Sequence, residues 1–335
     1  MDIMRYVMTI AVITVHFNYL TGYDLPYILG HHAVGGFFAI AGYLIYPNYI
    51  KKGSFMKYIA HRARRILPSY FAVVLFCAIG FACISSLGAG EYFLSSGFWK
   101  YLCANLTFLN WLHPVLPGVF DTPQFVTDTV NGALWTMKVD WLLCFFMPVF
   151  IWITVTRKWC TPQQGAVLFI LFSIAYSFAM SYLVRISGGN GLYAMLERQV
   201  FGQAYFFFFG MLVYFMRDFF TRHTPEMLVT GISIYLVSGA FGPALYMLFN
   251  PAGMTMILLS LSLMKPTVSW LHHRNNIAYE MYLSHFPVIQ LCVYTGVCSN
   301  GPWVAGAVVL TATVTVAWLI HHLALRINSS YRAIH

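Results

Sequence analysis

Long apolar runs alternate with short polar segments along the whole chain, and this pattern predicts membrane-spanning helices. A helix needs about 20 mostly apolar residues to cross the hydrocarbon core of a bilayer. The expected spans are residues 5–22, 29–49, 67–87, 132–155, 164–184, 199–216, 226–241, 244–264, 276–296 and 302–325. We therefore expect an all-α polytopic membrane protein with about ten transmembrane helices.

The longest interruption of this pattern is residues 88–131, which are rich in Gly, Pro, Asn and Asp. The segment is too short for a typical catalytic domain, so we expect any chemistry to lie within the helical bundle. Its aromatic and polar residues suit either a sugar-stacking surface or an interfacial belt, and we favour the belt. These residues are Trp99, Tyr101, Asn105, Asn110 and Trp111. Residues 1–335 are expected to form a single transmembrane domain without an appended soluble domain.

Composition and charge support this class and give an orientation. Only 9% of the residues are charged and 59% are hydrophobic, whereas soluble domains carry about 25% charged residues. The net charge of +9 suggests nucleic acid at first, but the positions of the charges argue for membrane topology instead. With a cytoplasmic N-terminus, every Lys and Arg lies on the inside except Lys100, Lys138, Arg185 and Arg198. We therefore expect both termini in the cytoplasm, a lipid bilayer as partner, and no nucleic acid.

The first predicted span carries one arginine and one histidine, Arg5 and His16, in an otherwise nearly apolar run. On a helix these two residues share a face and lie about 16 Å apart along the axis. Ionisable groups at membrane depth are costly and often mark function, and a neutral imidazole can take a proton from a hydroxyl group. We predict that His16 is catalytic; a histidine satisfied between helices is the structural alternative.

The densest charge in the chain lies between Lys51 and Pro68, and Pro68 is expected at the start of the third span. Within this stretch Arg62 and Arg65 are three residues apart and lie side by side on a helix. Paired guanidinium groups suit phosphate oxygens, which favours a phosphate clamp. Basic residues also anchor helices to lipid headgroups, and this stretch alone gives the two interpretations equal weight.

Three glycines of the second predicted span, Gly35, Gly36 and Gly42, allow a close approach of neighbouring helices. Helix packing is the favoured interpretation, and a narrow slot for a thin ligand is the alternative. His31 and His32 lie at the outer end of this span, but adjacent helical residues point about 100° apart. The seven cysteines show no CxxC spacing, so we expect no metal site.

Asp140, in the fourth predicted span, is one of few acidic residues expected at membrane depth. We expect Asp140 to pair with His16 and to set its tautomer, as a carboxylate does for a catalytic histidine. The local alternative is a pair with Lys138, but residues two apart do not face each other on a helix.

The ninth predicted span contains a second polar cluster. Tyr282 and His285 are three residues apart and share a face, and Pro287 favours a bend in the helix. Glu280 lies nearer the cytoplasmic end, and we expect it to belong to a structural polar cluster.

Together these five stretches resemble the acyltransferase-3 family of integral membrane acyltransferases. They are similar to its Arg-x10-His pattern, its Phe-Phe-x-x-Ser-Gly stretch, its Arg-x-x-Arg segment, its Leu-Trp-Ser-Leu-x-x-Glu and its Tyr-Leu-x-His. In this chain the matching residues are Arg5 with His16, 35–45, 62–68, 134–140 and 282–285. Two departures leave room for altered activity: Ala41 stands where the family usually has Ser, and Asp140 stands for Glu.

The resemblance implies transfer of an acyl group, most often acetyl, from cytoplasmic acyl-CoA to a hydroxyl of an extracytoplasmic carbohydrate or glycolipid. It also implies a bacterial inner membrane. Acetyl-CoA is then the expected donor substrate, with its phosphates held by Arg62 and Arg65, together with Arg5. The pantetheine arm is expected to thread beside the three glycines. We expect the acceptor to be bound by Tyr282, His285 and Trp135.

Other classes stay open at this point. A proton-coupled transporter would use His16, Asp140 and Glu280 as a relay, but it would not explain the basic pair at 62 and 65. A membrane-bound O-acyltransferase of the other large family would also use a buried histidine. A structural membrane protein predicts that Arg5 and His16 are replaceable. The acceptor, the acyl chain and the oligomeric state do not follow from the sequence.

Overall fold

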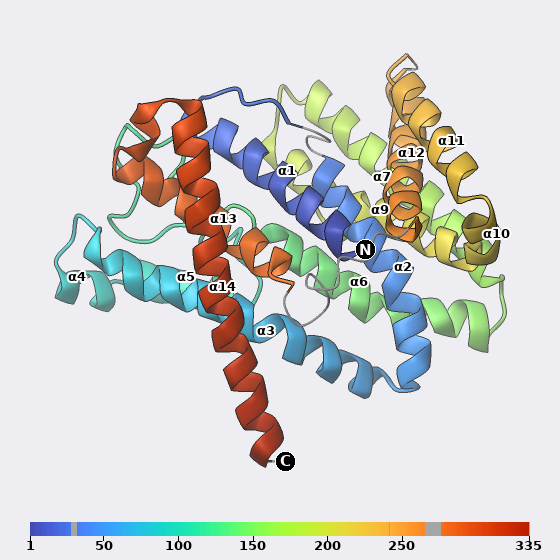
Figure 1. Ribbon diagram of the computed structural model, residues 1–335, viewed down its shortest axis with the longest axis horizontal. Coiled ribbons are helices and arrows are strands. Elements are labelled where there is room, and N and C mark those ends of the chain that lie inside the picture. Colours follow the sequence, from blue (N-terminus) through green and yellow to red (C-terminus); the bar gives the residue numbers. More distant parts are fainter. Residues whose placement is uncertain (28–31, 241, 265–275, 335) are drawn as a thin grey trace. The chain divides into compact units, whose positions relative to one another are not determined.

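A computed structural model describes residues 1–27, 32–240, 242–264 and 276–334, and every regular element within these ranges is helical (Figure 1). The prediction of an all-α protein is therefore confirmed. The chain divides into two units, each built from separate parts of the sequence. Unit 1 contains residues 1–8, 31–59 and 139–273, and unit 2 contains 9–30, 60–138 and 274–335. Among the predicted positions, His31, Lys265 and Arg274 lie outside the described residues.

Seven of the described helices are long and apolar enough to cross a membrane. They occupy Asp2–Thr21, His32–Lys52, Phe55–Cys83, Trp135–Thr156, Pro162–Ile186, Leu245–Leu263 and Pro302–Asn328. Three further expected spans coincide with α9, α11 and α13, which have 16, 15 and 17 residues. Even 17 helical residues extend only about 26 Å, slightly less than the hydrocarbon core of about 30 Å. The chain is thus a multi-pass membrane protein, and the count of about ten spans stays a prediction.

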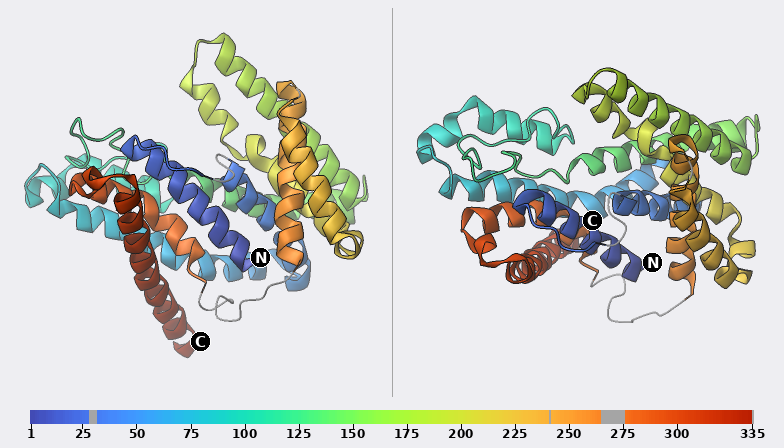
Figure 2. Two further views of the ribbon diagram at one scale, coloured as in Figure 1. Left: turned by 45° about the horizontal axis from the view of Figure 1, so that its top comes forward. Right: turned by 90° about the horizontal axis from the view of Figure 1, so that it is seen from above.

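Unit 1 consists of helices that pack through aromatic rings and small residues. Helix α9 contacts both α2 and α7, and α11 runs beside α12 (Figures 1 and 2). The helices of this unit are α2 (His32–Lys52), most of α6 (Trp135–Ile151), α7 (Pro162–Ile186), α8 (Gly191–Glu197), α9 (Val200–Phe215), α10 (Arg217–Arg222), α11 (Thr224–Ser238) and α12 (Pro243–Leu263). A π-helical turn, Trp152–Thr156, follows α6.

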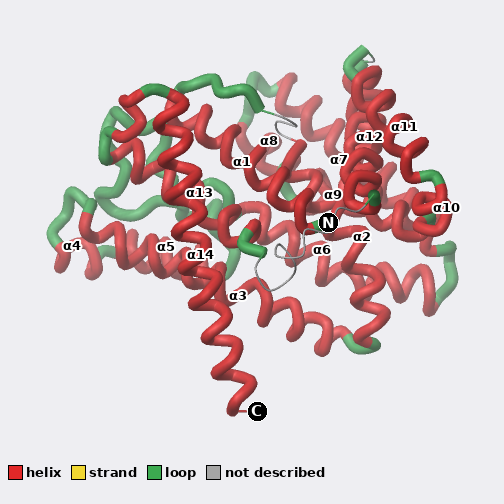
Figure 3. The backbone as a smooth tube through the Cα atoms, viewed as in Figure 1, coloured by secondary structure: helices red, strands yellow, loops and turns green. Residues whose placement is uncertain are grey.

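Unit 2 surrounds one almost completely buried helix, α13 (Ala278–Tyr294). Helix α14 (Pro302–Ile334) packs along α13, and the threonine hydroxyl of Thr9 on α1 donates to the Ala278 carbonyl, 3.1 Å away. The other helices are α1 (Asp2–Thr21) from Thr9 onward, α3 (Phe55–Gly80) from Ala60 onward, α4 (Ala89–Leu94) and α5 (Ser96–Leu106), with short 3-10 turns at Phe81–Cys83 and Val297–Asn300. A long non-helical connection joins α5 to α6 (Figure 3).

Helix α3 begins at Phe55, twelve residues earlier than expected from hydropathy, and Pro68 lies inside it rather than at its start. A proline in a helix lacks the N–H that would reach the carbonyl four residues back, here that of Arg64. The Asn328 side chain on α14 donates to this carbonyl at 3.0 Å. The expectation for Pro68 was wrong because a distant side chain completes the helix, and sequence periodicity does not show such a partner.

Candidate functional site

Arg5 and His16 lie on one unbroken helix, α1, so their predicted separation of about 16 Å holds. The Arg5 guanidinium forms an ion pair with Asp2, with 3.0 Å between Nη1 and Oδ1. The sequence prediction missed this partner, although the two residues are three apart and face each other on a helix. Asp2 also lies in the first turn, where the helix dipole favours an acidic side chain.

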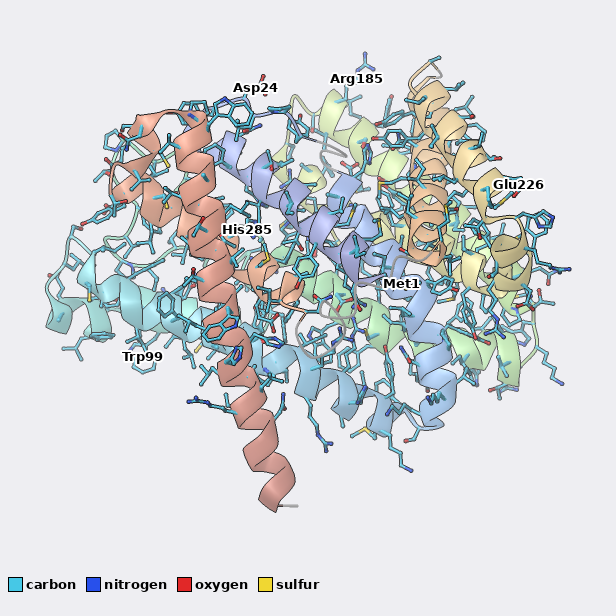
Figure 4. The ribbon with its side chains drawn as sticks, viewed as in Figure 1. Met1, Asp24, Trp99, Arg185, Glu226 and His285 are labelled. Carbon is cyan, nitrogen blue, oxygen red and sulfur yellow. The ribbon has the colours of Figure 1, made fainter. Side chains whose placement is uncertain are left out.

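His16 contacts a second histidine at the centre of unit 2. Its Nδ1 lies 2.8 Å from Nε2 of His285, and the two rings stack with centroids 5.0 Å apart. The ring of Phe286 meets His16 edge-on, with centroids 5.3 Å apart. His285 is fully buried, whereas His16 is half-buried and therefore accessible to a reactant. His285 is labelled on α13 in Figure 4.

The hydrogen bonds of His285 determine which nitrogen of His16 is basic. Nδ1 of His285 lies 2.7 Å from the Tyr282 carbonyl oxygen, which can only accept, so this nitrogen carries the proton. In the neutral ring Nε2 of His285 is then an acceptor, and Nδ1 of His16 donates to it. A neutral His16 therefore carries its lone pair on Nε2, and the tautomer suits a general base.

Helix α13 is held in place on both sides of His285 by the connection that precedes α6. Pro287 leaves the Leu283 carbonyl without its helical donor, and the Asn131 amide donates to that oxygen at 2.8 Å. One turn later, the Gln290 amide donates to the carbonyls of Thr127 and Thr129 at 2.9 and 3.1 Å. Asn131 and Gln290 are 3% and 0% exposed, so water cannot replace these bonds.

Two of the predicted motifs, distant in sequence, meet at Tyr282. The hydroxyl of Tyr282 is 2.9 Å from Oγ1 of Thr136, and it donates to the Ala133 carbonyl at 3.3 Å. Tyr282 is buried and Trp135, beside Thr136, is half-buried. The structure thus brings His16, Tyr282, His285 and the start of α6 together.

The basic pair lies on α3, as the spacing predicts. Arg62 is half-buried and Arg65 is exposed, and one helical turn separates them. Close to them, the Tyr279 hydroxyl of α13 donates to the Ile66 carbonyl at 3.3 Å. The basic pair therefore lies just before the part of α3 that contacts the start of α13, and Arg65 is exposed to solvent.

Comparison with known proteins identifies the family of the chain. The model of the acyltransferase-3 family, described as an acyltransferase domain, matches residues 1–322. The chain belongs to this acyltransferase family. It is 29% identical over 151 residues to an O-acetyl transferase of Shigella phage Sf6, a stretch that covers 44% of this chain and 43% of the phage protein. No solved structure matches the chain significantly.

This family membership confirms the predicted resemblance and, at the level of the family, the prediction of an acyltransferase. Four of the five motifs that carried the resemblance lie at the His16–His285 contact, at Tyr282 with the start of α6, and on α3. The fifth, 35–45, lies on α2 in unit 1. Less than half of the phage protein is matched, so its activity does not transfer to this chain without a test.

Glu280 forms a buried cluster with residues of two other helices. Oε1 of Glu280 accepts from the Ser69 hydroxyl at 2.8 Å and lies 3.2 Å from Nδ1 of His321. All three residues are buried, with 5% of Glu280, 0% of Ser69 and 9% of His321 exposed. Sequence reasoning missed His321, whose signal is only a pair of histidines in the last predicted span. The contacts agree with the structural role expected for Glu280.

The predicted roles of Asp140, Arg5 and the three glycines stay predictions. Asp140 is half-buried on α6 within unit 1, whereas His16 belongs to unit 2. A Cβ at Gly35 would lie 2.5 Å from the Phe206 ring, and one at Gly42 would meet the Phe207 carbonyl. Gly35 and Gly42 thus allow α2 and α9 to touch, whereas a Cβ at Gly36 would meet Met8 and Leu258. Close helix packing is the role favoured from the sequence.

Three of the five residues of segment 88–131 that were expected in an interfacial belt or a sugar-stacking surface are buried instead. Tyr101, Asn105 and Asn110 are 1%, 1% and 4% exposed. Asn105 accepts through its backbone carbonyl from the Tyr70 hydroxyl of α3 at 2.6 Å, which folds the segment onto the helix. Burial raises the pKa of the Tyr101 hydroxyl far above its usual value, so it stays neutral. Tyr101, Asn105 and Asn110 therefore belong to the buried core of unit 2 rather than to its surface.

Trp99 and Trp111, the other two of these five residues, are exposed. Trp99 points away from α5 (Figure 4). The Lys138 ammonium lies 5.2 Å from the centre of the Trp111 ring, a cation–π contact. Lys138 therefore has a partner in unit 2. Within the described ranges no group of three His, Cys, Asp or Glu side chains could hold a metal ion.

Proposed function

We propose that the protein is a membrane O-acetyltransferase that moves an acetyl group from acetyl-CoA to a hydroxyl of a carbohydrate. The donor arrives from the cytoplasm, and the acceptor is a surface polysaccharide or a glycolipid on the other side. Both termini are cytoplasmic, about ten helices cross a bacterial inner membrane, and residues 1–335 act as one domain. The observation that carries the proposal is the 2.8 Å contact between His16 and His285 in a chain of the acyltransferase family.

His16 is the general base of the proposed reaction. Its Nε2 takes the proton of the acceptor hydroxyl as that oxygen attacks the thioester carbonyl. A carbon–oxygen bond forms, the carbon–sulfur bond breaks, and the proton passes to the sulfur to give CoA with a free thiol. The sugar leaves as an acetyl ester. His285 keeps Nδ1 of His16 hydrogen-bonded throughout, so the ring holds its orientation while its charge changes.

A route in which His16 itself carries the acetyl group uses the same geometry. Nε2 then attacks the thioester, and the acceptor hydroxyl takes the acetyl group in a second step. Rapid acid quenching separates the two routes, because only the second leaves labelled acetyl on the protein.

Arg62 and Arg65 bind the phosphates of the donor in this proposal. A guanidinium fork matches phosphate oxygens, and the accessible Arg65 is the first of the two to meet a ligand from water. Arg5 assists them, and its ion pair with Asp2 fixes the side chain near the start of α1. Asp140 balances the charge that forms on His16, and Trp135 and Tyr282 line the acceptor side.

The deciding experiment measures transfer of labelled acetyl from acetyl-CoA by purified protein in vesicles. We expect the wild type to consume acetyl-CoA and His16→Ala to lose at least about 100-fold in rate, the lower end of general-base effects. His322→Ala is the matched control, because His322 is an exposed histidine on α14. An active His16→Ala would show that His16 is structural.

The same samples test the transporter alternative. An acyltransferase is protected from thermal unfolding by acetyl-CoA, whereas a proton-coupled transporter is not. A wild type that neither binds nor consumes acetyl-CoA would contradict the proposed function.

A further inference from the structure

A cleft opens in unit 2 where α1 and α13 end. Its volume is about 370 Å³, within the usual range of small-molecule sites of about 300–1,000 Å³. Its walls come from the last turn of α1, the turn that follows it, the end of α13 and the connection before α6. The main lining side chains are Leu20, Thr21, Tyr23, Gln124, Tyr294 and Ser299.

The lining is polar but carries no charged side chain. Its lining residues include two tyrosines, a threonine, a serine and a glutamine. The hydroxyls of Tyr23 and Thr21 donate to the carbonyls of Cys298 and Phe17, and their oxygens can still accept. Hydroxyls and amides both donate and accept, so they suit a ligand that has many hydroxyl groups of its own. The phosphates of CoA would find no cation here. This chemistry points to an uncharged sugar rather than to the donor.

Two observations show that the walls are built in place. The Tyr23 hydroxyl donates to the Cys298 carbonyl at 2.6 Å, which ties the turn after α1 to the turn after α13. The Asn18 side chain bonds both the N–H and the carbonyl of Leu25, at 3.0 and 2.8 Å. Tyr294 is 44% exposed, so its ring can stack on a sugar face.

The cleft lies next to His16 along α1 and at the opposite end of that helix from Arg5. Leu20 is four residues after His16 and shares its face, about 6 Å further along the axis. Thr21 lies about 24 Å from Arg5 by the same measure. A ligand in the cleft would therefore reach His16 from the side that the donor does not use.

We propose that this cleft binds the acceptor sugar, an uncharged polyol whose hydroxyl passes Leu20 to reach Nε2 of His16. The inference rests on the proposed function, and it adds the place where the acceptor binds and the absence of charge on the bound sugar. Tyr294 stacks on the sugar ring, and the hydroxyls of Thr21 and Ser299 together with the Gln124 amide bond its hydroxyls.

The test uses methyl hexopyranosides and methyl 6-deoxyhexopyranosides as acceptors for labelled acetyl-CoA. In Tyr294→Ala we expect the KM for an accepted glycoside to rise about tenfold, the effect of losing about 1.4 kcal/mol of binding, with less than about twofold change for acetyl-CoA. Ser299→Trp fills the cleft and should abolish acetylation of the glycoside. Ser299 is exposed, and protection by acetyl-CoA against heat shows that this variant is folded. Trp303→Ala, an exposed tryptophan outside the cleft, is the control.

The outcomes separate the inference from the proposed function. Glycoside acetylation that is unchanged in both cleft variants would overturn the inference while leaving the acetyltransferase standing. The same conclusion follows if the wild type turns over acetyl-CoA but accepts no glycoside. A wild type that neither binds nor consumes acetyl-CoA would remove the proposed function and the inference with it.

Discussion

Two helices of unit 2 are interrupted by a proline in the same way, and in both an asparagine from elsewhere in the chain completes the helix. In α13 the interruption is Pro287 and the donor is Asn131; in α3 it is Pro68 and the donor is Asn328. Both bonds join a side-chain amide to the carbonyl four residues before the proline, at 2.8 and 3.0 Å. The donor and acceptor groups are the same in both bonds, so their surroundings determine how much each bond contributes to stability.

The two bonds differ in their exposure to water and in the residues next to them. The bond of Asn131 is buried, and His285 lies between the carbonyl of Leu283 and Pro287. The bond of Asn328 is exposed to solvent in a stretch of basic residues. An unpaired polar group costs its full desolvation only where water cannot reach it. The comparison therefore teaches that α13 depends on its partners far more than α3 does.

The largest expected effect on the transfer rate comes from replacing His285, the histidine next to the buried bond of α13. His285→Ala removes the acceptor for Nδ1 of His16, so the tautomer and the ring orientation are no longer fixed. We expect the rate of acetyl transfer to fall about 100-fold, within the range for a positioned base. His285→Gln keeps an acceptor oxygen and should recover part of the rate. Equal rates in His285→Ala and wild type would show that the histidine pair is only packing.

Asn131→Ala comes next, because it leaves the buried Leu283 carbonyl without a donor. We expect a loss of about 1–3 kcal/mol in stability, measured by thermal or denaturant unfolding in detergent, and a slower transfer rate. The double variant Asn131→Ala/Pro287→Ala should regain most of both, since alanine restores the N–H that reaches Leu283. Without such recovery, the role of Asn131 would lie elsewhere than in completing the helix.

Gly132→Ala tests a second contact between α13 and the connection that precedes α6. A Cβ at Gly132 would lie 2.7 Å from the Phe286 ring, which packs edge-on against His16. The ring must move, at a cost of about 1–3 kcal/mol for overpacking, and it moves the base with it. We expect a smaller rate loss than in Asn131→Ala. Gly90→Ala, where the added Cβ meets open space, is the matched control.

Much of the fold was predictable because it depends on local patterns. Apolar runs located most of the long helices to within a few residues. The exceptions are α3, which begins at Phe55 and ends at Gly80 rather than spanning 67–87, and α14, which extends to Ile334 rather than ending at 325. The start of α7 follows a sequence rule as well: Thr161 and Gln164 form a capping box in front of the helix. The histidine of the first span was also predictable, because an ionisable group in an apolar run is conspicuous.

The rest of the site was not predictable, because it depends on which segments meet in space. The sequence predicted that Asp140 pairs with His16 and that His285 binds the acceptor. The structure shows His285 hydrogen-bonded to His16 instead. Asn131 looked like part of a polar loop, yet it is buried against α13. Composition shows whether a segment is polar or apolar. It does not show which backbone carbonyl a side chain of that segment will donate to.

The smallest expected effect is that of Asn328→Ala, and it decides whether burial is the true difference between the two prolines. Water can replace the lost amide at the exposed Arg64 carbonyl, so we expect a loss below about 1 kcal/mol in stability. The KM for acetyl-CoA should stay within about twofold of the wild type, because the bond lies on the backbone and leaves the guanidinium groups of α3 in place. A loss as large as that of Asn131→Ala would mean that every proline-freed carbonyl in this protein needs its own donor, whether or not water can reach it.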